Sequence, residues 1–207
     1  MELKINEKFG RLADDEAIKA AAVGLEKNGI KAIIADNRDV AIVEFRKLIP
    51  EGSEVMNMTS TTLMELGLDN EILESGKYRA VRKELESLGE EEKIKKLRFG
   101  AAHEYAVGSV HAITKNGEII IASATGSQLP AYAYGADKIV FIAGTQKIVK
   151  DFEEGMERIR EYVFPLENER ALKAYGMGSG INKILILNKE VNPGRITVIL
   201  VKEKLGF

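Results

Sequence analysis

The stretch "IIIASATGSQLPAYAYGADKIVFIAGTQKIV", Ile119 to Val149, contains two apolar runs that each end in small polar residues. Both runs are short and rich in Ile or Val, which is typical of buried strands. Thr125-Gly126-Ser127 follows the first run, and Pro130 suits the first turn of a short helix over "PAYAYGA". In open α/β sheets, ligands sit beyond the carboxyl ends of strands. The stretch therefore predicts two strands whose ends face a ligand.

The chain on either side of this stretch alternates between helical and strand patterns. Apolar residues recur at helical spacing from Ile18 to Leu25, and short strands are predicted at Lys31 to Ala35 and Ser53 to Met58. Two more strands are predicted near the C-terminus, in "KILIL" and "ITVILV". This order is typical of a parallel sheet covered by helices. We predict one α/β domain over residues 1–207: a three-layer, mainly parallel sheet with helices on both faces plus a hairpin.

The predicted hairpin has its turn at Asn116-Gly117, because both turn positions tolerate positive φ. A two-residue turn there places Lys115 opposite Glu118, a favourable pair of charges. The same register places His111 opposite Ala122.

Composition excludes several classes of function. Of the 207 residues, 45% are apolar and 30% are charged, with a net charge of -2, so no global field favours nucleic acid or an anionic membrane as a partner. The chain has no cysteine, which excludes disulfides, thiolate nucleophiles and an iron–sulfur cluster held by cysteine within it. No apolar run approaches the roughly 18 residues that span a bilayer, and the start lacks a signal core, so we expect a cytoplasmic protein.

Hydroxyls and glycines at strand ends are the candidate ligand-binding groups. Free amides at a helix N-terminus with nearby hydroxyls can hold a phosphate or carboxylate, and "TSTT" offers both. Thr62 with Glu65 matches a capping box, which leaves its neighbours free for a ligand. Gly126 lets the backbone approach a ligand closely, and Lys147 can neutralise an anion. The predicted ligand-binding residues are Ser60, Thr61, Thr125, Gly126, Ser127, Gln128, Gly144, Lys147, Asn182 and Lys183.

The acid–base candidates are few. His103 and His111 are the only histidines, and Glu104 lies between them. Two imidazoles and one acid make a weak ligand set, so no metal site is predicted, and Glu104 is the catalytic candidate because one placed carboxylate suffices for proton or acyl transfer. "YGMGSGINKIL" does not fit a dinucleotide fingerprint, because a helical segment precedes its glycines and a strand follows them. It predicts a ligand-facing loop instead.

The motifs "MTSTTLMELGL", "AVGSVHAIT", "GEIIIASATGSQLP" and "KIVKDFEEGMERI" occur in that order before a terminal "VILVKEKLGF". From about Ala17 to the end, the chain resembles the LUD-domain family, which includes lactate-utilisation protein C. The resemblance implies a fold related to ribose-phosphate isomerases, CoA transferases and formyltetrahydrofolate cyclo-ligases. It also implies a part in an iron–sulfur-containing system that oxidises lactate. Many members carry an acid before a Thr-Gly-Thr turn, where this chain has Ala124. If the activity of those members depends on that acid, this chain lacks the activity or uses Glu104 instead.

Three functions follow as hypotheses. The leading one is a LUD-domain protein that binds a small anionic metabolite, in or beside lactate-like organic-acid oxidation, with an iron–sulfur or flavin protein as redox partner. The second is an isomerase or an acyl- or CoA-transferase-type enzyme that uses Glu104. The third is a non-catalytic subunit or regulator. Whether the chain is an enzyme stays open, and analogy with the fold predicts a homo-oligomer.

Overall fold

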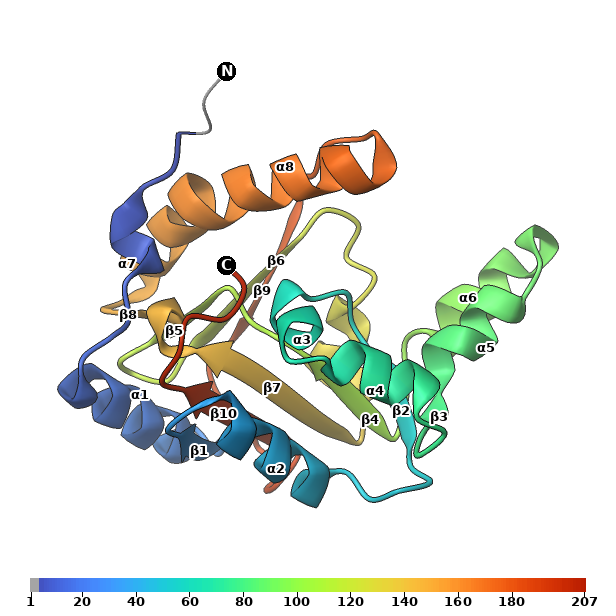
Figure 1. Cartoon of the computed structure of the whole chain (residues 1–207), viewed down its shortest axis with the longest axis horizontal. Helices are drawn as coiled ribbons and strands as arrows, with labels where there is room; N and C mark the ends of the chain where they lie inside the picture. The colour runs from blue at the N-terminus through green and yellow to red at the C-terminus, as the bar shows by residue number, and fades with distance from the viewer. Residues whose placement is uncertain (1–3) are drawn as a thin grey trace.

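Two β-sheets form the centre of the computed structural model, which describes residues 4–207, Glu90 by its backbone only (Figure 1). The larger sheet has the order β1-β10-β7-β4-β2-β3, and its five strand pairings are all parallel. Its strands are Lys31–Ala35 (β1), Glu54–Asn57 (β2), Arg79–Ala80 (β3), Tyr105–Gly108 (β4), Lys138–Gly144 (β7) and Ile196–Val201 (β10). The predicted α/β fold with a mainly parallel sheet is confirmed.

Helices cover one face of this sheet. Phe45, Leu63 and Ile72 belong to three different helices and pack with strand residues such as Val140 and Ile199. Side-chain caps begin some of these helices, as where Asn37 accepts a hydrogen bond from the Val40 amide (3.0 Å). Two short helices project from the body of the molecule (α5 and α6 in Figure 1). The helices of the N-terminal half are Asp15–Lys27 (α1), Arg38–Leu48 (α2), Thr61–Glu65 (α3), Leu68–Glu74 (α4), Val81–Ser87 (α5) and Lys93–Phe99 (α6).

The other face of the larger sheet is covered by α1 and by a second, smaller sheet. That sheet has the order β8-β5-β6-β9, with strands Ala112–Thr114 (β5), Ile119–Ser123 (β6), Ile148–Val149 (β8) and Lys183–Leu187 (β9). Alternate side chains of β6 point to opposite sides: Ile119 and Ile121 pack toward Phe141 of the larger sheet, whereas Ile120 packs against Met156. The outer helices are Phe152–Arg158 (α7) and Phe164–Tyr175 (α8), which a π-helical turn (Ile159–Val163) joins.

The hairpin forms, but the predicted register is wrong by one residue. Ile113 pairs with Ile119, and the Thr114 amide donates to the Glu118 carbonyl (2.9 Å). The loop therefore has three residues, 115–117, and closes through a hydrogen bond from the Gly117 amide to the Thr114 carbonyl (2.9 Å). Gly117 has a φ of 84°, so it is the left-handed residue that ends a three-residue loop rather than half of a two-residue turn.

A buried arginine ties β10 to the short helical turn at Ala131–Gly135. Arg195 donates to three carbonyl oxygens, those of Ala131 (3.2 Å), Tyr132 (3.2 Å) and Ala136 (3.0 Å). It also pairs with Glu190 at 2.7 Å, and both side chains are only 8% exposed. Because this turn follows the "SATGS" segment along the chain, Arg195 fixes the far end of the loop that was expected to face a ligand. No helix within residues 4–207 combines the length and the apolar character that a membrane span requires.

Candidate functional site

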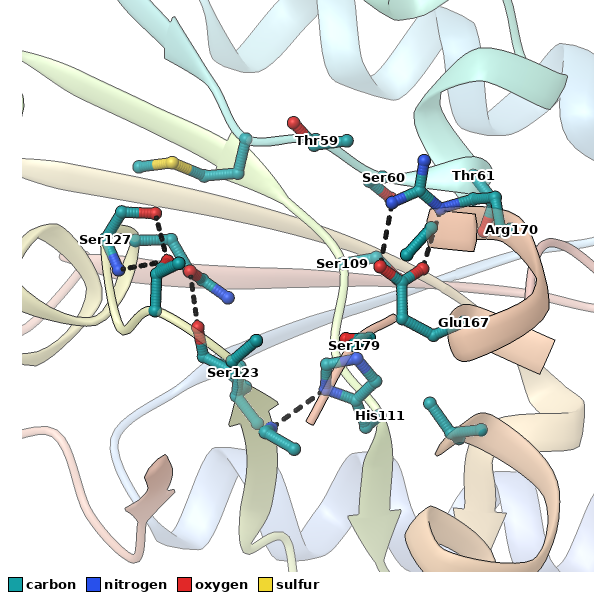
Figure 2. A pocket seen from close by; sticks show the side chains of 18 of the residues that line it. Thr59, Ser60, Thr61, Ser109, His111, Ser123, Ser127, Glu167, Arg170 and Ser179 are labelled. Carbon is teal, nitrogen blue, oxygen red and sulfur yellow. Dashed lines mark hydrogen bonds and ion pairs between the residues drawn. The ribbon is translucent and has the colours of Figure 1, made fainter. Parts of the chain in front are cut away.

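A cavity of about 430 Å³ lies beyond the carboxyl ends of β2, β4, β6 and β7. The residues that follow these strands form one wall, and α8 with the glycine-rich segment after it forms another. Figure 2 shows Glu167 and Arg170 of α8 on one side of Ser109 and His111, with Ser123 and Ser127 on the other. The strands β2, β4 and β7 are parallel members of the larger sheet, so their carboxyl ends meet at one edge of it, the usual ligand position in open α/β folds. The end of β6 reaches the same cavity from the smaller sheet.

Six of the predicted ligand-binding residues line this cavity. They come from three strand ends that lie far apart in the sequence: Ser60, Thr61, Thr125, Ser127, Gln128 and Lys147. The structure brings these loops together, and whether they bind a ligand stays a prediction.

The other predicted residues do not line the cavity. Lys183 donates from its Nζ to the Thr125 carbonyl, and Asn182 donates to the Ala124 carbonyl (3.1 Å), so both hold the loop around Gly126, which is itself absent from the lining. Gly144 faces the C-terminal segment, where a Cβ would collide with the Glu203 carbonyl oxygen.

Glu104 lies at the opposite end of its strand. It precedes β4, so it sits at the amino end of a strand whose carboxyl end faces the cavity. The carboxylate is exposed and accepts a hydrogen bond from the Glu54 amide (3.0 Å). His103 is buried beside Phe99 and does not line the cavity either, so only His111 of the predicted acid–base group does.

The predicted capping box at Thr62 is wrong. Ser60 is the N-cap of α3, and its hydroxyl accepts a long hydrogen bond from the Leu63 amide (3.4 Å). Thr62 is fully buried inside the helix, where its hydroxyl donates to the Leu205 carbonyl (3.2 Å) and accepts from Lys147 Nζ (3.1 Å). The Thr62 hydroxyl therefore holds the Lys147 amine in place and does not cap the helix.

Lys147 is buried without a carboxylate partner. It ends a 3-10 turn directly after β7, is 2% exposed, and donates from Nζ to Thr62 Oγ1 and to Ser109 Oγ (3.0 Å). No described carboxylate forms an ion pair with it; the charge of Glu65 acts only from farther away. Burial, and then the nearby Arg158, lower the pKa of Lys147 well below its ordinary value of 10.5.

Arg158 of α7 is a second buried basic side chain, close in the fold to Lys147. It donates to the backbone carbonyls of His111 and Gln146 (3.3 Å to the latter), and its guanidinium lies 5.3 Å from the centre of the Tyr162 ring. Burial lowers the pKa of Arg158 to about 10. The partners of Arg158 are carbonyl oxygens and the face of an aromatic ring. Neither Lys147 nor Arg158 therefore pairs with a carboxylate among the described side chains.

His111 presents a neutral imidazole to the cavity. Its Nδ1 accepts a hydrogen bond from the Ala122 amide (3.0 Å), so the ring proton must sit on Nε2. Burial, followed by the charges of Lys147 and Arg158, lowers the pKa of His111 to about 3. The ring therefore offers an N–H donor, and not a charge, at physiological pH.

We expect the His111 ring resonances in ¹H–¹⁵N NMR spectra to stay constant between about pH 8 and about pH 5, with the proton on Nε2. In the unfolded chain the same ring protonates near its ordinary pKa of 6.5. The unfolded state then binds more protons than the folded one below pH 6.5, so folding stability falls as the pH drops from there toward 3. The control is the same titration in concentrated urea. A folded-state midpoint near 6.5 would contradict the assignment.

The charges that line the cavity are mainly positive. Arg170 forms two hydrogen bonds of 2.7 Å to Glu167 on α8, and Arg82 donates to the Thr59 hydroxyl (2.6 Å). The lining thus holds two arginines and the buried amine of Lys147 against one carboxylate, and Arg170 already neutralises that carboxylate. Asn57 is buried in the lining, and its amide has no hydrogen-bond partner among the described residues.

Several residues of the cavity lining were not predicted from the sequence. Ser109 directly follows the strand Tyr105–Gly108, so the strand-end rule that selected Ser60 would have found it. No local signal marks Arg82, Glu167 or Arg170, because they reach the cavity only through the way α5 and α8 pack.

Comparison with known proteins identifies the family. The model of the LUD domain matches residues 18–201. A crystal structure of a DUF162 family protein from Deinococcus radiodurans has a TM-score of 0.56 and 13% identity, covering 92% of this chain and 99% of that one. A ribose 5-phosphate isomerase from Plasmodium falciparum has 14% identity and a TM-score of 0.35, covering 67% of this chain and 64% of that one. The likeness of fold therefore rests on the DUF162 family protein. No curated protein matches in sequence. The match covers most of the chain, which therefore belongs to the LUD domain family.

Proposed function

We propose that this protein binds a small anionic metabolite in the cavity at the carboxyl ends of its strands. One observation supports this most: the cavity lining carries two arginines and the amine of Lys147, and its single carboxylate is already paired with Arg170. An anion would add negative charge near the buried Arg158, which no described carboxylate pairs with. Charged groups of one sign in a concave, partly desolvated site favour a ligand of the opposite sign.

The donors of the cavity suit a carboxylate or phosphate. Hydroxyls come from Ser60, Thr61, Ser109 and Ser127, and His111 adds an Nε2–H. Carboxylate and phosphate oxygens are acceptors, so each can take several of these donors at once. A volume of about 430 Å³ lies within the range of roughly 300–1,000 Å³ found for small-molecule sites.

The biological setting that we propose rests on family membership. A LUD-domain protein in or beside lactate-like organic-acid oxidation would need a redox partner, an iron–sulfur or flavin protein, because this chain has no cysteine to hold a cluster. A cytoplasmic location, one domain over residues 1–207 and a homo-oligomer belong to the same proposal. We do not propose the enzyme that uses Glu104, since Glu104 lies at the amino end of β4.

The test is thermal unfolding with butyrate, lactate and inorganic phosphate. A ligand at about 100 times its dissociation constant adds roughly 2.7 kcal/mol, which raises the melting temperature of a protein of this size by about 5–10 °C. Arg170→Met removes a positive charge from the lining and leaves the Glu167 carboxylate unpaired beside the ligand, a change worth about 1.5–3 kcal/mol, so we expect binding about 10- to 100-fold weaker.

Arg160→Met is the matched control. Arg160 is exposed on the neighbouring π-helical turn and does not line the cavity, so binding should keep its wild-type strength. If none of the three anions stabilises the wild type, or if Arg170→Met and Arg160→Met behave alike, the proposed site is contradicted.

A further inference from the structure

We propose that Lys147 is a nucleophilic amine, which forms an imine with the carbonyl carbon of a small 2-oxo carboxylate bound in the cavity. This inference rests on the anion site proposed above and adds a substrate class and a covalent step to it. Three independent features carry the inference: the hydrogen bonds of Nζ, the charge around it, and the donors beside it.

The hydrogen bonds of Lys147 leave room for a lone pair. The Thr62 hydroxyl gives its only proton to the Leu205 carbonyl, so it must accept from Nζ. Ser109 Oγ is the second neighbour, at 3.0 Å. A neutral amine has two N–H groups and one lone pair, and these two oxygens satisfy both N–H groups. The lone pair is then free, in a residue that lines the cavity.

The surroundings favour the uncharged amine that such chemistry requires. Lys147 is 2% exposed, Arg158 donates to the carbonyl of the preceding residue Gln146, and no described carboxylate pairs with Lys147. A buried lysine next to another cation is one of the known ways to obtain a nucleophilic amine at neutral pH. The direction of the Lys147 pKa shift agrees with this geometry.

The neighbouring donors suit the rest of a 2-oxo acid. In such a molecule the carboxylate is one bond from the reacting carbonyl carbon, so its oxygens must find donors close to Nζ. Ser109 contacts Nζ, and His111, two residues farther along the chain, lines the same cavity and offers an Nε2–H. Ile121, Ile159 and Val163 also line the cavity and give an apolar surface for a short carbon tail.

The step is balanced without any further reactant. The Nζ lone pair forms a bond to the carbonyl carbon, the C–O π pair moves to oxygen, and one amine proton follows it to give a carbinolamine. The second amine proton then leaves with that hydroxyl as water, and a C=N bond remains. No oxidant or reductant takes part.

The experiment is borohydride trapping of the wild-type protein with 2-oxobutyrate, followed by intact-mass measurement and peptide mapping. We expect one reduced adduct per chain, located on Lys147, and no adduct with 2-hydroxybutyrate, which has the same carbon skeleton without the carbonyl. Lys147→Met should lose the adduct. Lys115→Met, at the exposed β5–β6 loop, should keep it. Thermal unfolding in the presence of butyrate is measured on all three proteins to report anion binding and folding separately.

The outcomes separate the two proposals. An adduct on Lys147 that Lys147→Met removes while that variant stays folded supports the imine. Adducts scattered over surface lysines, or none, together with stabilisation by butyrate, overturn the imine and leave the anion site standing. The absence of both trapping and stabilisation overturns both.

Discussion

Arg195→Met is expected to lower the free energy of unfolding by about 3–5 kcal/mol, the usual effect of removing one partner of a buried ion pair. The guanidinium satisfies three carbonyl oxygens of the 131–136 turn and the Glu190 carboxylate. Methionine fills a similar volume but leaves all four acceptors without this donor. The measurement is urea-induced unfolding followed by circular dichroism.

Two variants serve as controls for Arg195. Arg98→Met changes an exposed arginine on α6 and should shift stability by less than about 0.5 kcal/mol. Glu190→Gln removes the charge of the partner but keeps the three carbonyl contacts, so its effect should be smaller than that of Arg195→Met. Equal stability of Arg195→Met and wild type would show that the turn does not depend on this arginine.

Lys147→Met is expected to change stability in the opposite direction, with a gain of up to about 4 kcal/mol, in the range seen when buried charged groups give way to apolar ones. The variant removes an amine whose burial costs free energy and whose neighbours include Arg158. Lys147 lines the cavity. If its removal stabilises the protein in this way, the wild type has lost stability at this position for the sake of function.

The gain from Lys147→Met should depend on pH with a defined sign. Burial lowers the folded-state pKa below 10.5, so between these two pKa values the unfolded wild type binds more protons than the folded one. Wild-type stability therefore falls as the pH drops through this window, by up to about 1.4 kcal/mol per pH unit, and the Met variant lacks this effect. Urea unfolding at about pH 6 and about pH 9 should show the larger gain at the lower pH. A gain that is the same at both pH values would mean that Lys147 is charged in the folded protein.

Strand-end loops were predictable from the sequence because apolar runs mark the strands, and the parallel pairing of β2, β4 and β7 brings their ends together. The end of β6 joins them only because the smaller sheet packs against the larger one. Short apolar runs marked β2, β6 and β7, and the polar residues after them, such as Ser60, Thr125 and Lys147, share one cavity lining. The same reasoning did not apply to Glu104, which precedes a strand. A residue before a parallel strand lies at the opposite edge of the sheet from one that follows it.

Long-range packing and loop type could not be predicted locally. Glu167 and Arg170 are at i and i+3 on a helix whose pattern indicates only an ordinary ion pair; their place beside Ser109 depends on how α8 packs. The hairpin register depends on Gly117 taking a left-handed conformation at the end of a three-residue loop, and the Asn-Gly pair alone favours the shorter turn.

The last residues of the sequence form part of the cavity wall. Gln146 donates to the Leu205 carbonyl (2.9 Å), Gly206 donates from its amide to Glu65 (2.9 Å), and Phe207 lines the cavity. Any residues joined after Phe207 would begin their path at the wall of the site. Affinity tags for ligand-binding work therefore belong at the N-terminus, and a fused C-terminal reporter is expected to obstruct ligand entry even where the fold is intact.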